Sequence, residues 1–250
     1  MSDKLPDILP LNPYFREMVW GGRRLAELFG KELPDGAAIG ESFELSAYSG
    51  RESGVSAGPL RGVGLGALVE RYGAELLGSA VVERYGKCMP LLIKLLDARQ
   101  DLSIQVHPDD AYARAHDLRD NGKMEAWLVL HSDGGRVAYG LADGVDESAF
   151  AAAVTAGRVE DVIRFFPVQR GDLVFSPPGT VHALCAGVVI YEVQQSSDLT
   201  FRIYDYDRPG LDGKPRELHL QQALDVIDFS AQLPSPDRKS TRLNSSHLVI

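Results

Sequence analysis

The sequence predicts a mainly β fold, a barrel or sandwich of short strands with helical decoration. Short segments rich in apolar residues recur along the chain, and Gly, Pro and Asp residues separate them at close intervals, as is typical of all-β proteins. Helical periodicity is confined to the N-terminal half and the middle of the chain, so the regular alternation of an α/β protein is absent. The expected strands are residues 41–47, 89–97, 102–107, 125–130, 136–140, 172–176, 180–184, 188–194 and 199–204.

Four segments have the apolar spacing of amphipathic helices, namely residues 24–29, 66–72, 110–116 and 147–156. Asp109 is a suitable N-cap for the third, because a carboxylate can accept a backbone N–H of the first turn and Pro108 precedes it. The pair Gly21-Gly22 lacks the GxGxxG or GxxxxGK context of a glycine-rich phosphate loop. We therefore expect helices that decorate the β-structure without forming a nucleotide site.

Composition and charge exclude several classes of protein. The 250 residues carry a formal net charge of -9, which argues against a nucleic-acid-binding protein but allows a phosphorylated substrate, since a phosphate needs only a few well-placed cations. No apolar segment approaches the ~20 residues that span a bilayer, and the first residues carry no secretory signal. We expect a cytoplasmic protein that binds neither nucleic acid nor membranes, with Cys88 and Cys185 buried and reduced.

Three short segments carry side chains that can bind a metal ion. Gln105 and His107 are two residues apart on an expected strand and therefore share one face, which Ser103 joins. Lys123 and Glu125 share a face in the same way at the start of the next strand. His182 follows a tight Pro-Gly turn, and the resulting set of two imidazoles, a carboxylate and an amide oxygen suits zinc, with iron, manganese or cobalt as alternatives.

Each segment also has an ordinary structural interpretation. A Gln-Val-His strand is more often a half-exposed polar face, the segment before His182 can be a simple turn, and Glu125 alone is compatible with a solvated or ion-paired carboxylate. The arrangement favours the metal site, because a His/Glu set on early strands with a further His on a late strand is typical of cupin barrels. His116, His131 and His219 lack this context and are expected at the surface.

The segments SIQVHPDD, GKMEAW, PPGTVHAL and YEVQQSSDLTFRIYDYDR resemble the type I phosphomannose isomerases, in their short bacterial form. NPYFREMVWGG and IGESFELSA match the opening segments of the same family, so the resemblance extends over residues 12–229. It implies a cupin-type β-barrel (jelly roll) and a zinc-dependent aldose–ketose isomerase that interconverts mannose 6-phosphate and fructose 6-phosphate through an enediol.

The resemblance also implies roles for individual residues. It places one zinc ion per chain on Gln105, His107, Glu125 and His182. It implies a functional arginine at Arg202, phosphate contacts at Lys94 and Ser103, an active-site lysine at Lys123, and acidic residues near the reacting carbons at Glu192 and Asp198. The implied partner is a small sugar phosphate.

The chemistry of the side chains gives a second basis for the catalytic roles. A guanidinium at Arg202 can stabilise developing negative charge, although an ion pair with Asp198 or Asp205 is an alternative. For the base we prefer Glu192, with Asp198 second, because burial beside apolar neighbours raises the pKa of a carboxyl group. A hydrogen-bonded structural residue is the alternative for Glu192.

Lys94 interrupts the apolar segment PLLIKLLDA. A charge inside a buried strand is costly unless it has a task or a partner. We therefore interpret Lys94 as a phosphate ligand, with Ser103 and Lys123 beside it. A salt bridge to Asp97 or Asp101 is the competing explanation.

Two other functional classes remain open for a metal-binding barrel of this kind. An Fe(II) cupin oxygenase would use a similar His/Glu site, but the cations Lys94, Lys123 and Arg202 favour a sugar phosphate over a neutral substrate. A non-catalytic cupin that binds sugar phosphates is the third class, and the presence of Arg202 and all four metal-ligand candidates disfavours it.

The family resemblance and the C-terminal string together predict how the chain is divided. We expect residues 1–229 to form the cupin catalytic domain, with the start of a truncated C-terminal β-domain near its end, and residues 230–236 to be linker-like. The string DRKSTRLNSSH at residues 237–247 matches a translated sequencing-library adapter, so residues 237–250 are expected not to belong to the natural protein. A polar disordered tail is the alternative.

Overall fold

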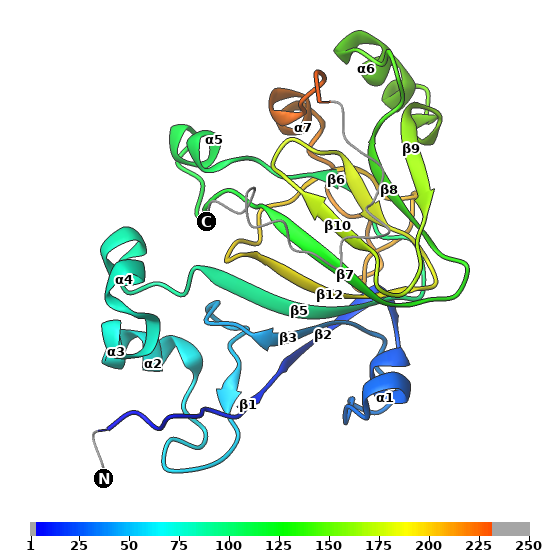
Figure 1. Cartoon of the computed structure of the whole chain (residues 1–250). Coiled ribbons are helices and arrows are strands. Elements are labelled where there is room, and N and C mark those ends of the chain that lie inside the picture. Colours follow the sequence, from blue (N-terminus) through cyan, green and yellow to red (C-terminus); the bar gives the residue numbers. More distant parts are fainter. Residues whose placement is uncertain (1–3, 232–250) are drawn as a thin grey trace.

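The computed structural model describes residues 4–231, in which two antiparallel sheets face each other (Figure 1). The larger sheet has six strands in the order β10-β7-β12-β5-β3-β2. Its strands are β2 (Tyr14–Gly22), β3 (Ile39–Leu45), β5 (Leu91–Ala98), β7 (Glu125–Ser132), β10 (Leu173–Ser176) and β12 (Val188–Gln195). The expected adapter-derived residues 237–250 and most of the linker-like residues 230–236 lie outside the described part of the chain.

The second sheet has five strands in the order β13-β6-β11-β8-β9. Its strands are β6 (Ile104–Val106), β8 (Arg136–Leu141), β9 (Ile163–Pro167), β11 (His182–Leu184) and β13 (Phe201–Tyr204). A separate two-stranded sheet pairs β1 (Leu11–Asn12) with β4 (Gly54–Val55). The prediction of a mainly β, cupin-type fold with helical insertions is confirmed.

The main core lies between the two large sheets. Leu96, Trp127 and Ile190 from the six-stranded sheet pack with Val137 and Leu184 from the five-stranded sheet, and all five are at most 5% exposed. Alternation along the strands explains this arrangement, because every second side chain of a strand points to the same face. On β12, Ile190 enters this core, whereas Val189 packs on the opposite face.

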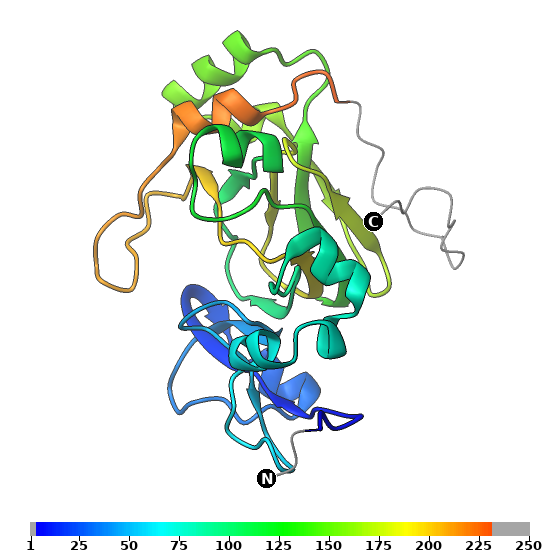
Figure 2. The ribbon, with the colours of Figure 1, turned by 90° about the vertical axis from the view of Figure 1, so that its left-hand side faces the viewer.

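Helices cover the outer faces of the sheets. Helix α6 (Glu147–Thr155) and helix α7 (Leu220–Val226) pack on the five-stranded sheet through Phe150 and Ala223, which join a core with strand residues such as Ile104 (Figures 1 and 2). Helix α1 (Arg24–Phe29) covers the six-stranded sheet through Leu25. The remaining elements are α2 (Leu65–Tyr72), α3 (Ala74–Leu77), α4 (Ser79–Tyr85), α5 (Asp110–Ala115) and the 3-10 helix η1 (Val159–Val162). Within residues 4–231, no helix is long and apolar enough to cross a bilayer.

The strands and helices expected from the sequence are present, with ends that differ by a few residues. The N-cap at Asp109 is confirmed, since its carboxylate accepts the backbone N–H of Tyr112 at 2.7 Å. The elements that were not expected are the strands β1, β2, β4 and β9, the helices α3, α4 and α7, and the 3-10 helix η1. Strand β2 lies at the sheet edge and pairs with β3 through two register irregularities, so its residues lack the clean alternation by which a strand is predicted.

The two cysteines differ in burial. Cys185 is buried and reduced, as expected, but Cys88 is exposed, so the expectation that both are buried is wrong for Cys88. Cys88 precedes β5 in the connection from α4, outside the apolar core of the strand. The apolar residues of β5 follow Cys88, and most of them are buried. Cys88 itself lies in the connection before this strand, where it is exposed to solvent.

Two glycines lie just before β11 and β7, where the backbone of another segment comes close. Gly179 has a φ of +81° before β11, and a Cβ there would lie 2.9 Å from the backbone oxygen of Val226. Gly122 precedes β7, and a Cβ there would lie 2.3 Å from the backbone carbon of Asp109. Both contacts are with backbone, which has little room to move, so a side chain at either position displaces a neighbouring segment.

We predict that Gly122→Ala destabilises the chain, because its methyl group overlaps the Asp109 backbone. The expected loss in the free energy of unfolding is roughly 1–3 kcal/mol, the usual range for overpacking. Gly54→Ala is the matched control, since its Cβ would meet nothing within 4 Å. Urea denaturation of both variants measures the effect, and an equal stability of the two would contradict the assigned packing.

Candidate functional site

A cleft with a volume of about 690 Å³ opens between the two sheets. Of the ten residues for which the sequence predicts a role, all line this cleft except His107 and His182, which are 2% and 1% exposed. The eight that line it are Lys94, Ser103, Gln105, Lys123, Glu125, Glu192, Asp198 and Arg202. Residues separated by more than 100 positions in sequence are thus brought to one place by the fold.

Strand register explains why these residues meet. In the six-stranded sheet, Glu192 on β12 lies directly opposite Lys94 on β5 and Trp127 on β7. In the facing sheet, Gln105 on β6 lies opposite His182 on β11 and Arg202 on β13. Opposite residues of antiparallel strands have Cβ atoms about 5 Å apart, so each sheet presents a lateral row of polar side chains to the cleft.

Backbone hydrogen bonds join the three segments that carry the candidate metal ligands. The N–H of Gly179, just before β11, donates to the carbonyl oxygen of His107 at 2.9 Å. The N–H of Lys123 donates to the carbonyl oxygen of Pro108, also at 2.9 Å. These bonds tie the segment after β6 to the starts of β7 and β11.

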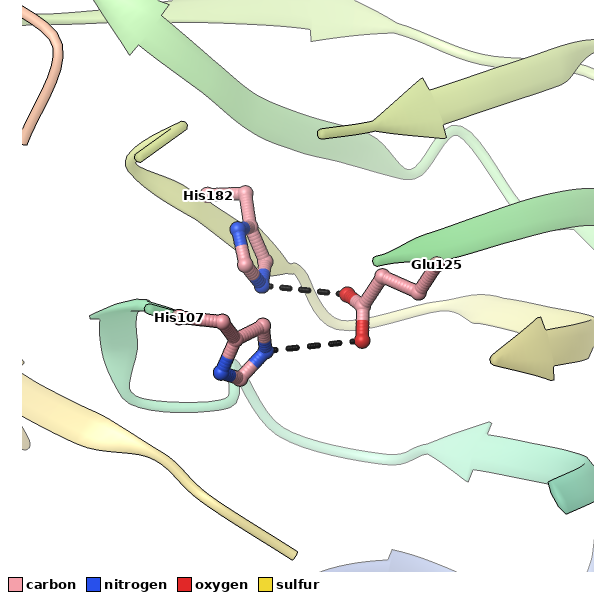
Figure 3. A group of neighbouring side chains, drawn as sticks. All are labelled: His107, Glu125 and His182. Atoms are coloured by element: carbon pink, nitrogen blue, oxygen red, sulfur yellow. Dashed lines mark ion pairs between the residues drawn. The ribbon is translucent and has the colours of Figure 1, made fainter. Parts of the chain in front are cut away.

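His107, Glu125 and His182 form a buried cluster (Figure 3). Glu125 Oε1 lies 3.1 Å from His182 Nε2, and Glu125 Oε2 lies 3.4 Å from His107 Nε2. One potential ligand atom from each residue falls within a mutual distance of 4.8 Å. The structure therefore brings these three residues together, and their role as metal ligands stays a prediction.

The chemistry of the cluster suits a cation. His182 Nδ1 lies 2.8 Å from the carbonyl oxygen of Thr180, so Nδ1 donates its proton there and Nε2 faces Glu125. Burial, with the charge of Lys123, lowers the pKa of His107 to about 3, so this imidazole is neutral. Neutral imidazole nitrogens and a carboxylate are the donors that transition metals bind.

Atoms without a well-formed hydrogen bond give a second observation in favour of a cation. Both ring nitrogens of His107 and both carboxylate oxygens of Glu125 are buried without a hydrogen bond of good geometry among the described residues, although Glu125 Oε2 also forms an ion pair with Lys123 Nζ at 3.0 Å. Buried polar atoms normally find such a partner, because an unmet one costs about 1–3 kcal/mol. Burial alone would raise the pKa of Glu125, but the charge of Lys123 and the contacts with the two histidines outweigh it and hold the pKa well below its usual value.

Gln105 lies beside the cluster. Its side-chain Nε2 is 3.5 Å from His182 Nε2, and its Oε1 accepts a hydrogen bond from Ser103 Oγ at 3.3 Å. The two ends of an amide have nearly the same shape, so a half-turn of the group directs the oxygen to the cluster instead. The sequence prediction that Ser103 shares a face with Gln105 is confirmed by this contact.

A second buried group lies on the six-stranded sheet. Glu192 Oε1 accepts a hydrogen bond from Trp127 Nε1 at 3.0 Å, and Glu192 Oε2 lies 3.4 Å from Lys94 Nζ. Burial raises the pKa of Glu192, although Lys94 opposes the shift. The expectation that burial raises this pKa is confirmed, and a carboxylate of this kind is a stronger base than an exposed one.

The partner of Lys94 is not one that the sequence suggested. Its Nζ lies 3.4 Å from Glu41 Oε1, whereas the expected alternatives Asp97 and Asp101 accept backbone N–H groups of Arg24 and Ala186. Asp97 belongs to the same strand as Lys94 but three positions away, on the opposite face. The alternative of a salt bridge to Asp97 or Asp101 is therefore wrong.

Asp198 lies at the rim of the cleft between two arginines. Its carboxylate is 2.5 Å from Arg51 Nη1 and 3.7 Å from Arg16 Nη1. Burial would raise the pKa of Asp198, but the hydrogen bond and charge of Arg51 and the charge of Arg16 lower it. A carboxylate so stabilised is a weaker base than Glu192, which supports the preferred order of the two candidates.

Arg202 has no carboxylate within 4.0 Å among residues 4–231, and its Nη1 donates to the backbone oxygen of Glu217 at 2.8 Å. The expected alternative of an ion pair with Asp198 or Asp205 is therefore wrong, since Asp205 pairs with Arg208 and Arg216. Burial and the nearby charge of Arg216 lower the pKa of Arg202. Among the cleft cations, its charge is the least compensated.

His219 corrects the expectation that it lies at the surface. Its side chain is 23% exposed, lines the cleft, and accepts the backbone N–H of Arg202 through Nδ1 at 3.2 Å. It belongs to the connection between β13 and α7, which projects from the body of the protein (orange, Figure 2). This connection has no periodic pattern in the sequence, so its return to the cleft was not predictable.

Three cleft residues were not singled out from the sequence. All three lie in segments that resemble the family, namely Glu41, Arg16 and Trp127. No motif or spacing around them indicated a functional role. Arg16 Nη1 contacts Glu41 Oε2 at 2.9 Å, so the two form a pair across β2 and β3. A carboxylate two residues from Phe43, on the same face of an expected strand, was the signal that could have identified Glu41.

Comparisons with known proteins agree with this geometry. The family "Phosphomannose isomerase type I, catalytic domain" matches residues 8–134. The chain is 39% identical over 218 residues to the probable mannose-6-phosphate isomerase GmuF of Bacillus subtilis, covering 87% of this chain and 67% of the relative. A mannose-6-phosphate isomerase of Streptococcus mutans is 38% identical over 218 residues, with 87% and 66% covered. The chain thus spans about two thirds of the length of these curated relatives.

Solved structures support the same relationship. The crystal structure of the mannose 6-phosphate isomerase from Bacillus subtilis matches with a TM-score of 0.79 and 36% identity, covering 88% of this chain and 68% of that one. A putative mannosephosphate isomerase from Archaeoglobus fulgidus matches with a TM-score of 0.74 at 23% identity, over 94% of this chain and 74% of that one, and this shows the fold alone. Fold, site geometry and sequence together confirm the expected resemblance: the chain belongs to the type I phosphomannose isomerases, a family of enzymes.

Proposed function

We propose that this chain provides the catalytic domain of a zinc-dependent isomerase that interconverts mannose 6-phosphate and fructose 6-phosphate. The observation that carries the proposal is the pairing of two buried features in one cleft. One is the His107, Glu125 and His182 cluster, in which atoms of His107 and Glu125 lack a well-formed hydrogen bond among the described residues. The other is Glu192, a carboxylate of raised pKa. A cation site beside a base is what proton abstraction next to a carbonyl requires.

We assign the metal to His107, Glu125, His182 and Gln105, which supply two nitrogens and two oxygens. Zinc is favoured over the alternatives because this mixed set of imidazole and oxygen donors is common in its catalytic sites. When bound, zinc supplies a positive charge that polarises carbonyl and hydroxyl oxygens of the substrate. The assignment of one ion per chain follows from the single such cluster within residues 4–231.

In the proposed reaction, Glu192 moves one proton between two carbon atoms. Its Oε2, which has no hydrogen bond among the described residues, takes the proton from C2 of the aldose, and the electron pair of the C–H bond forms the enediolate. The same proton returns to C1 while a proton passes from O2 to O1, which yields the ketose without net oxidation. Trp127 holds Glu192 in place through the other oxygen.

The cations of the cleft have separate tasks in this proposal. Arg202 stabilises the negative charge of the enediolate, since no carboxylate of residues 4–231 forms an ion pair with its guanidinium. Lys94 and Ser103 bind the phosphate, as the sequence suggested, and Lys123 donates to a substrate oxygen. Asp198 keeps Arg16 and Arg51 at the rim and contributes its negative charge near the reacting carbons.

A coupled assay that detects fructose 6-phosphate formed from mannose 6-phosphate tests this function directly. Activity that a chelator removes and zinc restores supports it. Substrate binding without turnover in the zinc-loaded full chain would favour a non-catalytic cupin. Bound iron with oxygen-dependent turnover would favour the Fe(II) oxygenase. The cytoplasmic location expected from the sequence stays a prediction.

We predict that His182→Ala removes the bound zinc. The change deletes a buried ligand whose Nε2 faces Glu125, and three remaining donors hold the ion too weakly to survive gel filtration. Metal content measured by mass spectrometry is expected to fall from one zinc per chain to near zero. His116→Ala, at an exposed histidine, is the control, and zinc retention by His182→Ala would refute the ligand assignment.

A second variant separates charge stabilisation from metal binding. Arg202→Ala is expected to keep its zinc and to lose turnover by about 10²–10³-fold, the usual cost of losing one transition-state donor. Arg158→Ala, at an exposed arginine with an ion pair at the surface, serves as control. Near-normal turnover of Arg202→Ala would show that Arg202 is not the electrophile.

Glu192→Gln tests whether Glu192 is a base or a structural residue. Its raised pKa means that the folded state binds a proton more tightly than the unfolded state, so stability falls as pH rises from 4.5 through the raised value. We predict that Glu192→Gln abolishes turnover yet raises the free energy of unfolding at pH 7 by roughly 1 kcal/mol.

The comparison of Glu192→Gln with the wild type is made by urea denaturation at pH 7 and at pH 4. The gain in stability should shrink at the lower pH, where the wild-type carboxyl group is protonated. A loss of stability at pH 7, with turnover retained, is the result that the structural alternative predicts.

A further inference from the structure

Glu41 is a buried carboxylate in the cleft to which the proposed reaction assigns no task. It lies on β3 and is 7% exposed. Its Oε2 contacts Arg16 Nη1 at 2.9 Å, and its Oε1 lies 3.4 Å from Lys94 Nζ. Burying a third carboxylate beside Glu192 and Glu125 is costly, so a purely structural account has to explain why an apolar side chain does not occupy this strand position.

The ammonium group of Lys94 lies midway between two carboxylates. Its Nζ is 3.4 Å from Glu41 Oε1 and also 3.4 Å from Glu192 Oε2. A charge-assisted bond between an ammonium group and a carboxylate normally closes to about 2.7–2.9 Å. Both contacts are longer than that, so neither carboxylate captures the cation. The ring of Phe43, whose centroid is 4.9 Å from Nζ, supports Lys94 from a third side.

Arg16 fixes the position of Glu41. The guanidinium holds Oε2 of Glu41 and reaches Asp198 at 3.7 Å, so Glu41 cannot move towards Lys94 without breaking a shorter ion pair. Glu41 therefore attracts Lys94 from a fixed point on β3. The opposite carboxylate, Glu192, is held by Trp127 through Oε1, which leaves Oε2 as the oxygen that Lys94 would otherwise occupy.

We propose that Glu41 is a positioning residue that draws the Lys94 ammonium away from Glu192 and so keeps Glu192 Oε2 free to accept the substrate proton. The inference rests on the proposed isomerase function, because it assigns Glu192 the role of base. Without the charge of Glu41, Lys94 moves onto Glu192 and forms a short ion pair. An oxygen engaged in such a bond is a poorer proton acceptor.

The test uses Trp127, one of the two tryptophans of the chain, as a reporter. In the ¹H–¹⁵N spectrum of the full chain, the indole N–H of Trp127 reports on the carboxylate that it contacts. Glu41→Gln keeps the shape of the side chain and removes its charge, and it is expected to shift the Trp127 indole resonance. Glu44→Gln is the matched control, because Glu44 lies on the same strand and also pairs with a lysine, Lys31, at 2.8 Å.

Turnover provides the second measurement. Glu41→Gln is expected to lower kcat on the order of tenfold, a part of the 10²–10⁴-fold that a positioned base contributes. Glu41→Asp, which restores the charge, should recover part of the loss. A purely structural role for Glu41 would instead lower the unfolding midpoint without moving the Trp127 resonance or kcat of the folded protein.

A double-mutant cycle shows whether Glu41 acts through Lys94. In the Lys94→Gln background, Glu41→Gln should no longer affect kcat or the Trp127 resonance, because the cation that it positions is gone. Additive effects would overturn the inference. If Lys94→Gln does not fold, the double variant, which removes both buried charges together, is compared with Glu41→Gln alone.

The outcomes separate this inference from the proposed function. A wild-type chain without isomerase activity, in which Glu41→Gln still shifts the Trp127 resonance, would refute the function and leave the positioning contact established. An active wild type in which Glu41→Gln changes neither kcat nor the resonance would refute the role of Glu41 and leave the function intact.

Discussion

Charged side chains buried between two facing sheets impose the constraint on which this site depends. Lys94, Glu192, Glu125 and Lys123 are each at most 5% exposed, and an isolated charge at such depth is far too costly to retain. Each therefore needs an opposite charge or a bound cation within a few ångströms. This requirement accounts for the chain of contacts from Arg16 through Glu41 and Lys94 to Glu192, and for Lys123 beside Glu125.

The antiparallel register of the strands meets this requirement. Glu192 lies opposite Lys94 on one side and Trp127 on the other, so one strand position determines both contacts of the proposed base. In the facing sheet, Gln105 lies between His182 and Arg202, which brings a proposed metal ligand next to the proposed electrophile. A shift of one residue in either sheet would turn these side chains away from the cleft.

Much of this arrangement could be predicted from local sequence. Strand alternation placed Gln105 with Ser103 and Lys123 with Glu125, and the apolar surroundings of Glu192 indicated its raised pKa. The partners of Lys94 and Arg202 could not be predicted. The partners of Lys94 lie on other strands, and only the pairing of β3 with β5 brings Glu41 to Lys94. Arg202 donates to Glu217, which lies in the connection between β13 and α7. The expectation that His219 lies at the surface was wrong for a similar reason. The connection that carries His219 returns to β13 without a periodic pattern in the sequence.

A cation held by the buried cluster of His107, Glu125 and His182 is central to the proposed function. Anomalous diffraction from crystals of the purified protein, recorded on both sides of the zinc absorption edge, tests this most directly. A single zinc peak at about 2.0–2.2 Å from Nε2 of His182, a nitrogen of His107 and an oxygen of Glu125 is the expected result. A cluster that stays free of metal in zinc-saturated crystals, with Glu125 hydrogen-bonded to a protonated histidine instead, would contradict the account.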